Sequence, residues 1–237
     1  MAELKIISSG SKGNGYIIET KSEKLLLELG VSWNKILGCL DYDISNVVGA
    51  LVSHRHSDHA ISLNKAISYR IPVFSCKDVW EVNNNVVVLD ANKKYKIGNF
   101  RVQPIPVEHN VENYAYLIEH DEIGRLLFFT DCTSFPYGIK NLNHILAEAN
   151  YSLDIALNKA IDGEEIRSHN EYHCEIESTL ETLEMLNNPN LNNIVLIHLS
   201  DGQSDEKLFK QKVFDVTGIE PYIADKDQII EINKEEF

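Results

Sequence analysis

The chain has 237 residues, of which 43% are hydrophobic, and its 22 basic and 36 acidic residues give a formal net charge of −14. This hydrophobic content suffices for a core of ordinary size and excludes an intrinsically disordered chain. Because basic surfaces bind long nucleic acids, the acidic balance favours a small substrate instead. No apolar run reaches the roughly 18–20 residues that span a membrane, so no membrane association is expected. The start, MAELKIISSG, lacks the pattern of a signal peptide, which predicts a cytoplasmic protein.

Short strands dominate the elements that the sequence predicts. The first third predicts strands at Leu4–Ser8, Tyr16–Glu19, Leu25–Glu28 and Val47–Val52, a glycine-rich turn at Ser9–Gly15, and a helix at His59–Tyr69. The next stretch predicts strands at Val86–Leu89, Lys94–Ile97, Phe100–Pro104, Tyr114–Glu119 and Arg125–Thr130. The last third predicts helices at Glu175–Leu186 and Glu206–Val213, with strands at Ile194–Ile197 and Ile229–Ile232. Helices spaced among many strands predict a mixed α/β sandwich rather than an alternating βαβ sheet.

The most specific motif follows the predicted strand Val47–Val52 and reads Ser-His-Arg-His-Ser-Asp-His over residues 53–59. On a turn after a strand, His54 and His56 point the same way, while Asp58 and His59 begin the next turn. Imidazole and carboxylate ligands together suit zinc, manganese or iron. Because clustered histidines repel one another when protonated, they gain nothing without a metal. The segment therefore predicts a metal site.

Three later residues are candidates for the remaining ligands. His109 follows a predicted strand, and Asp131 and His198 end the apolar runs Leu126–Thr130 and Ile194–Ile197. Ligands at strand ends converge at one edge of a sheet, where a rigid scaffold positions them. Taken alone, each residue is equally well explained as a capped or solvated polar group, and the 53–59 motif decides in favour of metal binding.

These segments, in this order, resemble the metal motifs of the metallo-β-lactamase fold superfamily. The turn Ser8-Ser9-Gly10-Ser11-Lys12-Gly13-Asn14 and the later His198-Leu199-Ser200 resemble its small single-domain hydrolases, the WalJ-like group. Viral relatives of this kind include the anti-Pycsar phosphodiesterases, phage enzymes that degrade cyclic mononucleotide defence signals. The resemblance covers nearly the whole chain. It implies one domain over residues 1–237, folded as a four-layered αββα sandwich of the α/β (α+β) class with the site at one edge of the two sheets.

The resemblance also implies two divalent metal ions, zinc or manganese, held by seven residues. One ion is expected on His54, His56 and His109, the other on Asp58, His59 and His198, with Asp131 between them. Two such ions about 3.5–4 Å apart activate a water as hydroxide for attack on phosphorus or a carbonyl carbon. Asp58 is expected to orient that water as well. His173, aligned with a histidine of the family, is the candidate to give a proton to the leaving oxygen or, when protonated, to bind the phosphate, and the alternative is a surface histidine.

Several other residues receive expectations. Ser11 and Asn14 are candidates to line the substrate pocket, although their turn is also explained as a simple connection between two strands. Glu148 and Asn150 are candidates to hydrogen-bond the ligand histidines, and a plain structural role is equally open. His120 lies in a charged turn and is expected in solvent.

The sequence departs from the family pattern at two strand ends. Where the family has Asp-x-Gly, this chain has Glu28-Leu29-Gly30, outside the expected ligand set. Where Thr-Gly often follows the bridging aspartate, this chain has Cys132-Thr133. Neither change affects an expected ligand.

Four functions are compatible with these observations. The first is a phosphodiesterase for a small substrate, with 3′,5′-cyclic mononucleotides as the leading candidate and linear monophosphates as products, acting in the host cytoplasm if phage-encoded. The second is a DNA or RNA nuclease, which requires a basic groove from residues such as Lys12, Arg55, Lys140 and Arg167. The third is a thioester or lactone hydrolase, and the fourth is a metal module without catalysis. The resemblance also implies a homodimer in which the neighbouring subunit helps to close the pocket.

Overall fold

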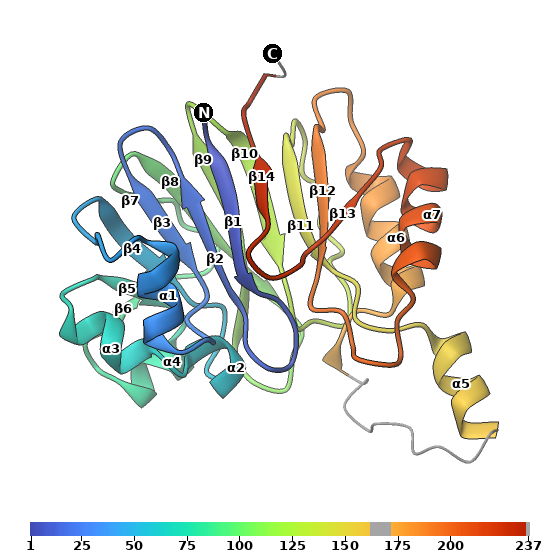
Figure 1. Ribbon diagram of the computed structural model, residues 1–237, viewed down its shortest axis with the longest axis horizontal. Coiled ribbons are helices and arrows are strands. Elements are labelled where there is room, and N and C mark those ends of the chain that lie inside the picture. Colours follow the sequence, from blue (N-terminus) through green and yellow to red (C-terminus); the bar gives the residue numbers. More distant parts are fainter. Residues whose placement is uncertain (162–171, 236–237) are drawn as a thin grey trace.

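The computed structural model describes residues 1–161 and 172–235, and these form two seven-stranded sheets that lie face to face (Figure 1). In sheet A the strand order is β14-β1-β2-β3-β4-β5-β6, and in sheet B it is β13-β12-β11-β10-β9-β8-β7. The strands of sheet A are β1 (Glu3–Ser8), β2 (Gly15–Glu19), β3 (Lys24–Leu27), β4 (Val47–Leu51), β5 (Val73–Ser75), β6 (Val87–Val88) and β14 (Ile229–Glu231). Those of sheet B are β7 (Tyr95–Ile97), β8 (Phe100–Val107), β9 (Asn113–His120), β10 (Gly124–Phe129), β11 (His144–Glu148), β12 (Asn193–Ile197) and β13 (Tyr222–Ile223).

Helices cover the outer faces of the two sheets (Figure 1). Sheet A is flanked by α1 (Trp33–Cys39), α2 (Ser57–Ala60), α3 (Leu63–Ser68) and α4 (Lys77–Val82), and sheet B by α6 (Ile176–Leu186) and α7 (Glu206–Thr217). Helix α5 (Leu153–Ile161) extends away from the body below α7 (Figure 1). This confirms the αββα sandwich that the family resemblance implies. Among the described residues, no helix is both long and apolar enough to cross a membrane.

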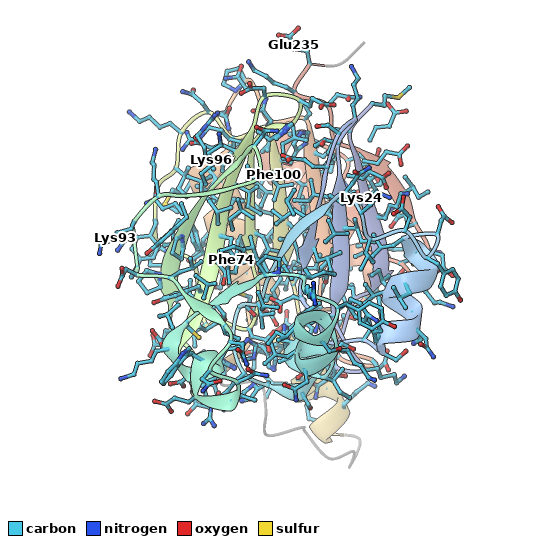
Figure 2. The ribbon with its side chains drawn as sticks, turned by 90° about the vertical axis from the view of Figure 1, so that its left-hand side faces the viewer. Lys24, Phe74, Lys93, Lys96, Phe100 and Glu235 are labelled. Carbon is cyan, nitrogen blue, oxygen red and sulfur yellow. The ribbon has the colours of Figure 1, made fainter. Side chains whose placement is uncertain are left out.

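The central strands of sheet B are buried on both faces. Along β10, Leu126 and Phe128 belong to the core between the sheets, whereas Leu127 and Phe129 pack in the second core under α6 and α7. Such a strand reads as a continuous apolar run, because successive side chains point to opposite faces and both faces are covered. At the far edge of the sheet the pattern alternates, and Figure 2 shows Phe100 inside while Lys93 and Lys96 project outward.

The predicted helix His59–Tyr69 is divided into α2 and α3, which corrects the single helix. Ser62, at the break, directs its backbone N–H to Leu29 and its hydroxyl to the carbonyl of Val31. These bonds tie the chain to the loop after β3 and interrupt the helical series. The strand predicted at Phe100–Pro104 continues to Val107, because β9 pairs with β8 from Arg101 to Val107.

The carboxyl ends of five strands meet at one edge of the sandwich. Strands β3 and β4 are parallel in sheet A, and β10, β11 and β12 are parallel in sheet B. Because parallel strands end at the same edge, the segments that follow β4, β10 and β12 lie near one another. These segments begin at Val52, Thr130 and His198 and carry most of the candidate ligands.

Candidate metal centre

Three histidines and one aspartate form a first cluster, defined by His54, His56, His109 and Asp131. One ligand atom from each lies within 4.8 Å of the others. His54 Nε2 is 3.0 Å from His56 Nδ1, and His56 Nδ1 is 3.3 Å from His109 Nε2. His54 Nε2 also lies 3.5 Å from Asp131 Oδ2. The structure thus brings together the residues that the sequence predicts for one metal ion.

A second cluster contains Asp58, His59, Asp131 and His198, again within 4.8 Å of one another. His59 Nε2 lies 3.3 Å from Asp58 Oδ2 and 3.2 Å from Asp131 Oδ2. His198 Nε2 lies 3.6 Å from Asp58 Oδ2. Asp131 belongs to both clusters, at the position expected for a carboxylate between two ions.

The protonation preferences of the first cluster fit a cation. Burial lowers the pKa of His54 well below its usual range and that of His109 to about 4, so these rings are neutral near pH 7. Their Nε2 atoms nevertheless both face His56 Nδ1, which has either one lone pair or one N–H and therefore cannot form a well-directed hydrogen bond with both rings. A divalent cation satisfies the facing lone pairs at once, and imidazole with carboxylate is a donor set that zinc and manganese accept.

In the second cluster, buried histidines lie among carboxylates. Burial opposes protonation of His198, but Asp131, Asp58 and Glu148 overcome it and raise its pKa to about 10. Burial likewise opposes protonation of His59, and the neighbouring carboxylates raise its pKa well above the usual value. Positive charge is therefore favoured at this place. His198 Nε2, which lies 3.6 Å from Asp58 Oδ2, is buried and has no hydrogen-bond partner among the described residues.

The backbone turns sharply at the strand ends that supply these groups. Asp131 and His198 have φ of 49° and 55°, in the left-handed region that non-glycine residues rarely adopt. Glu28, after β3, has φ of 62°. Such conformations cost about 1–3 kcal/mol each and persist where the surroundings fix them, typically at functional sites. Here they turn three acidic or imidazole side chains from the strand ends into the cluster region.

Glu148, at the end of β11, is the main support of the second cluster. Its Oε1 accepts hydrogen bonds from His173 Nδ1 at 2.7 Å and His198 Nδ1 at 3.0 Å. Its Oε2 accepts the backbone N–H groups of Cys132 at 3.2 Å and Cys174 at 3.3 Å. Burial works against ionisation of Glu148, but the two histidine bonds lower its pKa, so the group is a carboxylate. The expected contact between Glu148 and a candidate ligand histidine is present.

Asn150 also contacts His198, through its Nδ2 at 2.7 Å from the backbone oxygen and 3.1 Å from Nδ1. Glu28, which lies outside the ligand set expected from the sequence, also contacts a candidate ligand. It is buried, accepts the Ser53 N–H at 3.1 Å, and lies 3.5 Å from His59 Nδ1. Its signal was the acidic residue at the end of an apolar strand, the same signal that pointed to Asp131.

The two pocket candidates lie in different surroundings. Ser11 is exposed in the β1–β2 loop, whereas Asn14 is only 1% exposed and reaches His59 Nε2 at 3.1 Å. Asn14 therefore lies in the wall of the second cluster. The expectation for His120 was wrong, because this residue is 6% exposed and packs against the ring of Phe100, with Nε2 3.4 Å from Glu23. Its turn closes over the inter-sheet core instead of entering solvent.

Of the four cations that a nuclease groove would need, Lys12 and Arg55 are paired with carboxylates. Arg55 Nε is 3.6 Å from Asp78 and Lys12 Nζ is 2.8 Å from Asp201. The carbonyl of Lys140 accepts a hydrogen bond from Arg125, which lies at the opposite edge of sheet B. Arg167 lies outside the described residues.

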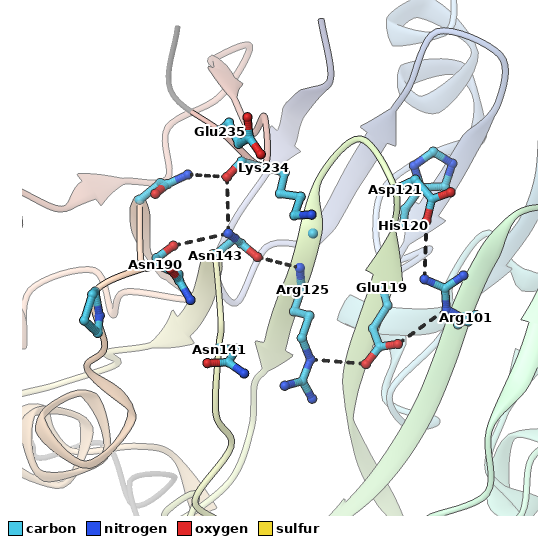
Figure 3. A pocket seen from close by; sticks show the side chains of 13 residues that line it. Arg101, Glu119, His120, Asp121, Arg125, Asn141, Asn143, Asn190, Lys234 and Glu235 are labelled. Atoms are coloured by element: carbon cyan, nitrogen blue, oxygen red, sulfur yellow. Dashed lines mark hydrogen bonds and ion pairs between the residues drawn. The ribbon is translucent and has the colours of Figure 1, made fainter.

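A cavity of about 760 Å³ occupies that opposite edge (Figure 3). Asn143 spans it, accepting the Arg125 N–H at 3.0 Å and donating to the carbonyls of Asn190 and Lys234. Glu119 forms ion pairs there with both Arg101 and Arg125, so its carboxylate partly offsets the charge of the two guanidinium groups. The cavity begins where β10 begins and is thus separated from the clusters by the length of that strand.

A family model described as a beta-lactamase superfamily domain matches residues 37–199. The chain belongs to this superfamily. Exodeoxyribonuclease YycJ of Bacillus anthracis is 24% identical over 168 residues, and exodeoxyribonuclease WalJ of Streptococcus pneumoniae is 25% identical over 169 residues. Each match covers 63% of this chain and 63% of the relative, so the chain spans less than two thirds of these relatives.

Among solved structures, the metallo-beta-lactamase fold protein YhfI from Bacillus subtilis superimposes with a TM-score of 0.79 at 15% identity. The superposition covers 98% of this chain and 100% of YhfI, which establishes the fold. The resemblance to the superfamily and to its WalJ-like group is thereby confirmed. The chain thus combines the metallo-beta-lactamase fold with two clusters of residues that could hold metal ions.

Proposed function

We propose that this protein is a hydrolase that cleaves phosphodiesters at a centre of two divalent metal ions, zinc or manganese. The carrying observation is that Asp131 is shared by two clusters of ligand atoms, each within 4.8 Å. His54, His56 and His109 would hold one ion, and Asp58, His59 and His198 the other. When bound, two such ions supply an activated water nucleophile and neutralise charge on phosphoryl oxygens. The relatives named exodeoxyribonucleases support phosphodiester chemistry.

The chain's own residues then orient the reactants. Asp58 is more exposed than the buried His59, since 25% of its side chain is accessible. Its carboxylate can therefore also orient the attacking water. His173 is fixed through Nδ1 by Glu148, which leaves Nε2 as the atom that donates a proton to the leaving oxygen. Of the His173 side chain, 17% is accessible, as contact with a substrate requires.

For the substrate, we propose a small phosphodiester, with 3′,5′-cyclic mononucleotides as the first choice and linear monophosphates as products. The net charge of −14 supports this choice, as does the pairing of Arg55 with Asp78 and of Lys12 with Asp201. Carboxylates beside the cations reduce the attraction that a long phosphate backbone needs. Degradation of a defence signal by a phage-encoded protein is a role consistent with this chemistry.

A second candidate is exodeoxyribonuclease activity. The specific observation in its favour is the printed activity of the two relatives, YycJ and WalJ. An exonuclease binds the end of a strand, so it needs fewer phosphate contacts than a protein that tracks along the polymer. A thioester or lactone substrate has no comparable support in the relatives.

One product assay separates these candidates. Protein loaded with zinc or manganese is offered cyclic mononucleotides, cyclic dinucleotides, and single-stranded DNA and RNA, with a His56→Ala/His59→Ala variant as blank. Release of linear monophosphates from cyclic mononucleotides, with polymers intact, supports the first proposal. Cleavage of polymers alone replaces it with the exonuclease. If no substrate in the panel is hydrolysed, the phosphodiesterase function is refuted.

We also propose a homodimer in which the partner helps to close the substrate pocket. Light scattering coupled to size-exclusion chromatography measures the mass against 26.9 kDa for one chain. A single species of one-chain mass at assay concentrations contradicts the dimer.

A further inference from the structure

Asn14 is fixed beside the second cluster by its backbone. Its N–H donates to the carbonyl of Asp58 at 2.8 Å, and its own carbonyl accepts the Gly30 N–H at 2.8 Å. Gly30 is required for this approach, since a Cβ there would lie 1.6 Å from the Asp58 oxygen. The β1–β2 loop is therefore joined to the helix that carries two candidate ligands.

The side-chain amide of Asn14 has only one orientation compatible with its neighbours. Its Oδ1 accepts the Gly10 N–H at 2.8 Å and the Tyr16 hydroxyl at 3.4 Å. A backbone N–H can only donate, so the oxygen must face Gly10 and the nitrogen must face the opposite way. The Ser9 hydroxyl forms a hydrogen bond with the Tyr16 hydroxyl at 2.8 Å and accepts the backbone N–H of His198 at 2.8 Å. The arrangement is thereby connected to His198, a candidate ligand of the second cluster.

The amide nitrogen consequently faces the ligand atoms. Asn14 Nδ2 lies 3.3 Å from the Asp58 carbonyl oxygen and 3.1 Å from His59 Nε2, the atom of His59 that faces Asp58 and Asp131. A nitrogen lone pair that holds a cation cannot also accept a hydrogen bond. With the cluster loaded, one N–H of Asn14 loses its acceptor although the residue is 1% exposed. A buried donor without an acceptor is costly, so the site favours an oxygen ligand within its reach.

We propose that this N–H of Asn14 donates to a phosphoryl oxygen of the bound substrate at the second cluster. The inference rests on the proposed phosphodiesterase function and assigns a catalytic residue to it. The non-bridging oxygens gain negative charge as the nucleophile attacks, and a donor aimed there stabilises that charge. Four hydrogen bonds already fix the backbone and side chain of Asn14, so the donor needs no reorganisation during the reaction.

The test uses inorganic phosphate as probe and zinc-loaded protein. Asn14→Leu has a similar shape but no donor and no charge, and Asn14→Asp keeps the acceptor toward Gly10 but loses the donor. Asn143→Leu is the matched control, since Asn143 is also buried and bonded to backbone groups, at the opposite edge of sheet B. Calorimetry measures phosphate affinity, elemental analysis measures bound zinc, and steady-state kinetics measures turnover.

We expect Asn14→Leu to retain the zinc content of the wild type and to bind phosphate roughly ten-fold or more weakly, the effect of losing one hydrogen bond to a charged group. Turnover falls at least as much, while Asn143→Leu binds phosphate like the wild type. In NMR spectra, the side-chain amide signals of Asn14 are identified as those that disappear in Asn14→Asp. In the wild type these signals should shift when phosphate is added, and this measurement does not require a stable leucine variant.

Two results overturn the inference. One is an absent response to phosphate, seen either as unchanged phosphate affinity in Asn14→Leu or as unshifted Asn14 amide signals. The other is loss of zinc from Asn14→Leu, which would show that Asn14 acts in metal retention. In both cases the wild type still binds phosphate and cleaves phosphodiesters. Failure of the proposed function is different, because then the zinc-loaded wild type itself does neither.

Discussion

Replacing Glu148 by glutamine isolates the charge of the group that supports the second cluster. The substitution keeps the shape but leaves one acceptor oxygen where the carboxylate has two. If that oxygen faces the N–H groups of Cys132 and Cys174, the new amide NH₂ faces the Nδ1 atoms of His173 and His198. His198 Nδ1 must then accept, and its proton moves to Nε2, the atom directed into the cluster. In the opposite orientation, two buried N–H groups lose their acceptor.

The size of the effect follows from the bonds lost. Two hydrogen bonds to a buried charged acceptor, at about 1.5–3 kcal/mol each, predict a decrease of about 3–6 kcal/mol in the free energy of unfolding. Supporting groups of metal-ligating histidines typically change metal affinity about 10–100-fold, so a zinc affinity lower by that factor is expected for Glu148→Gln. Turnover falls with it, because His173 depends on the same carboxylate oxygen.

Urea denaturation of the metal-stripped protein measures stability, and titration against a competing chelator measures zinc affinity. Glu23→Gln is the matched control, since Glu23 is also buried beside a histidine, His120, but lies away from the clusters. Glu23→Gln should lose stability and keep its zinc affinity. Wild-type zinc affinity in Glu148→Gln, or an equal loss in both variants, would falsify the reasoning that Glu148 acts through the histidines.

Three further variants test other parts of the site and fold. His56→Ala combined with His59→Ala removes one ligand from each cluster, so activity disappears and bound metal falls while the circular dichroism spectrum is kept; full activity would refute the metal mechanism. His173→Ala should lower turnover at least ten-fold with normal metal content, and metal loss would show that it is a ligand. His144 has a pKa lowered by burial from 6.5 to about 4, so its contribution to stability is complete above pH 6.5 and decreases as the pH falls toward 4. Relative to His144→Gln, the wild type should lose about 3 kcal/mol of unfolding free energy between pH 7 and 4, and a constant difference in urea titrations would contradict the assigned burial.

Much of the scaffold was predictable because its strands are apolar runs bounded by turns. The strand Leu126–Phe129 and the carboxylate after it could be identified from six residues. The same reading missed β11, whose sequence is His-Ile-Leu-Ala-Glu, because polar residues stand at both ends of a three-residue apolar centre. Both polar ends are nevertheless buried, with Glu148 held by histidines and backbone N–H groups. Only tertiary contacts make that burial favourable.

The candidate ligands were predictable for a different reason, since a dense motif and a known order of strand ends indicated all seven. Their supports were harder to predict. Asn14 and Glu28 contact His59 from loops that precede it by 45 and 31 residues in the chain, and no local pattern encodes such contacts. The short elements α1, β5, α4 and α5 were missed because three to nine residues carry too little periodicity.

The division of ligands between the two halves of the chain has a consequence for the order of events during synthesis. All four members of the first cluster have been made once the ribosome passes Asp131, whereas the second cluster also needs His198. Between these points the chain adds β11 and, with it, the carboxylate of Glu148 that holds His198. During synthesis, one complete set of candidate ligands is thus present in the chain before the last member of the other set has been added.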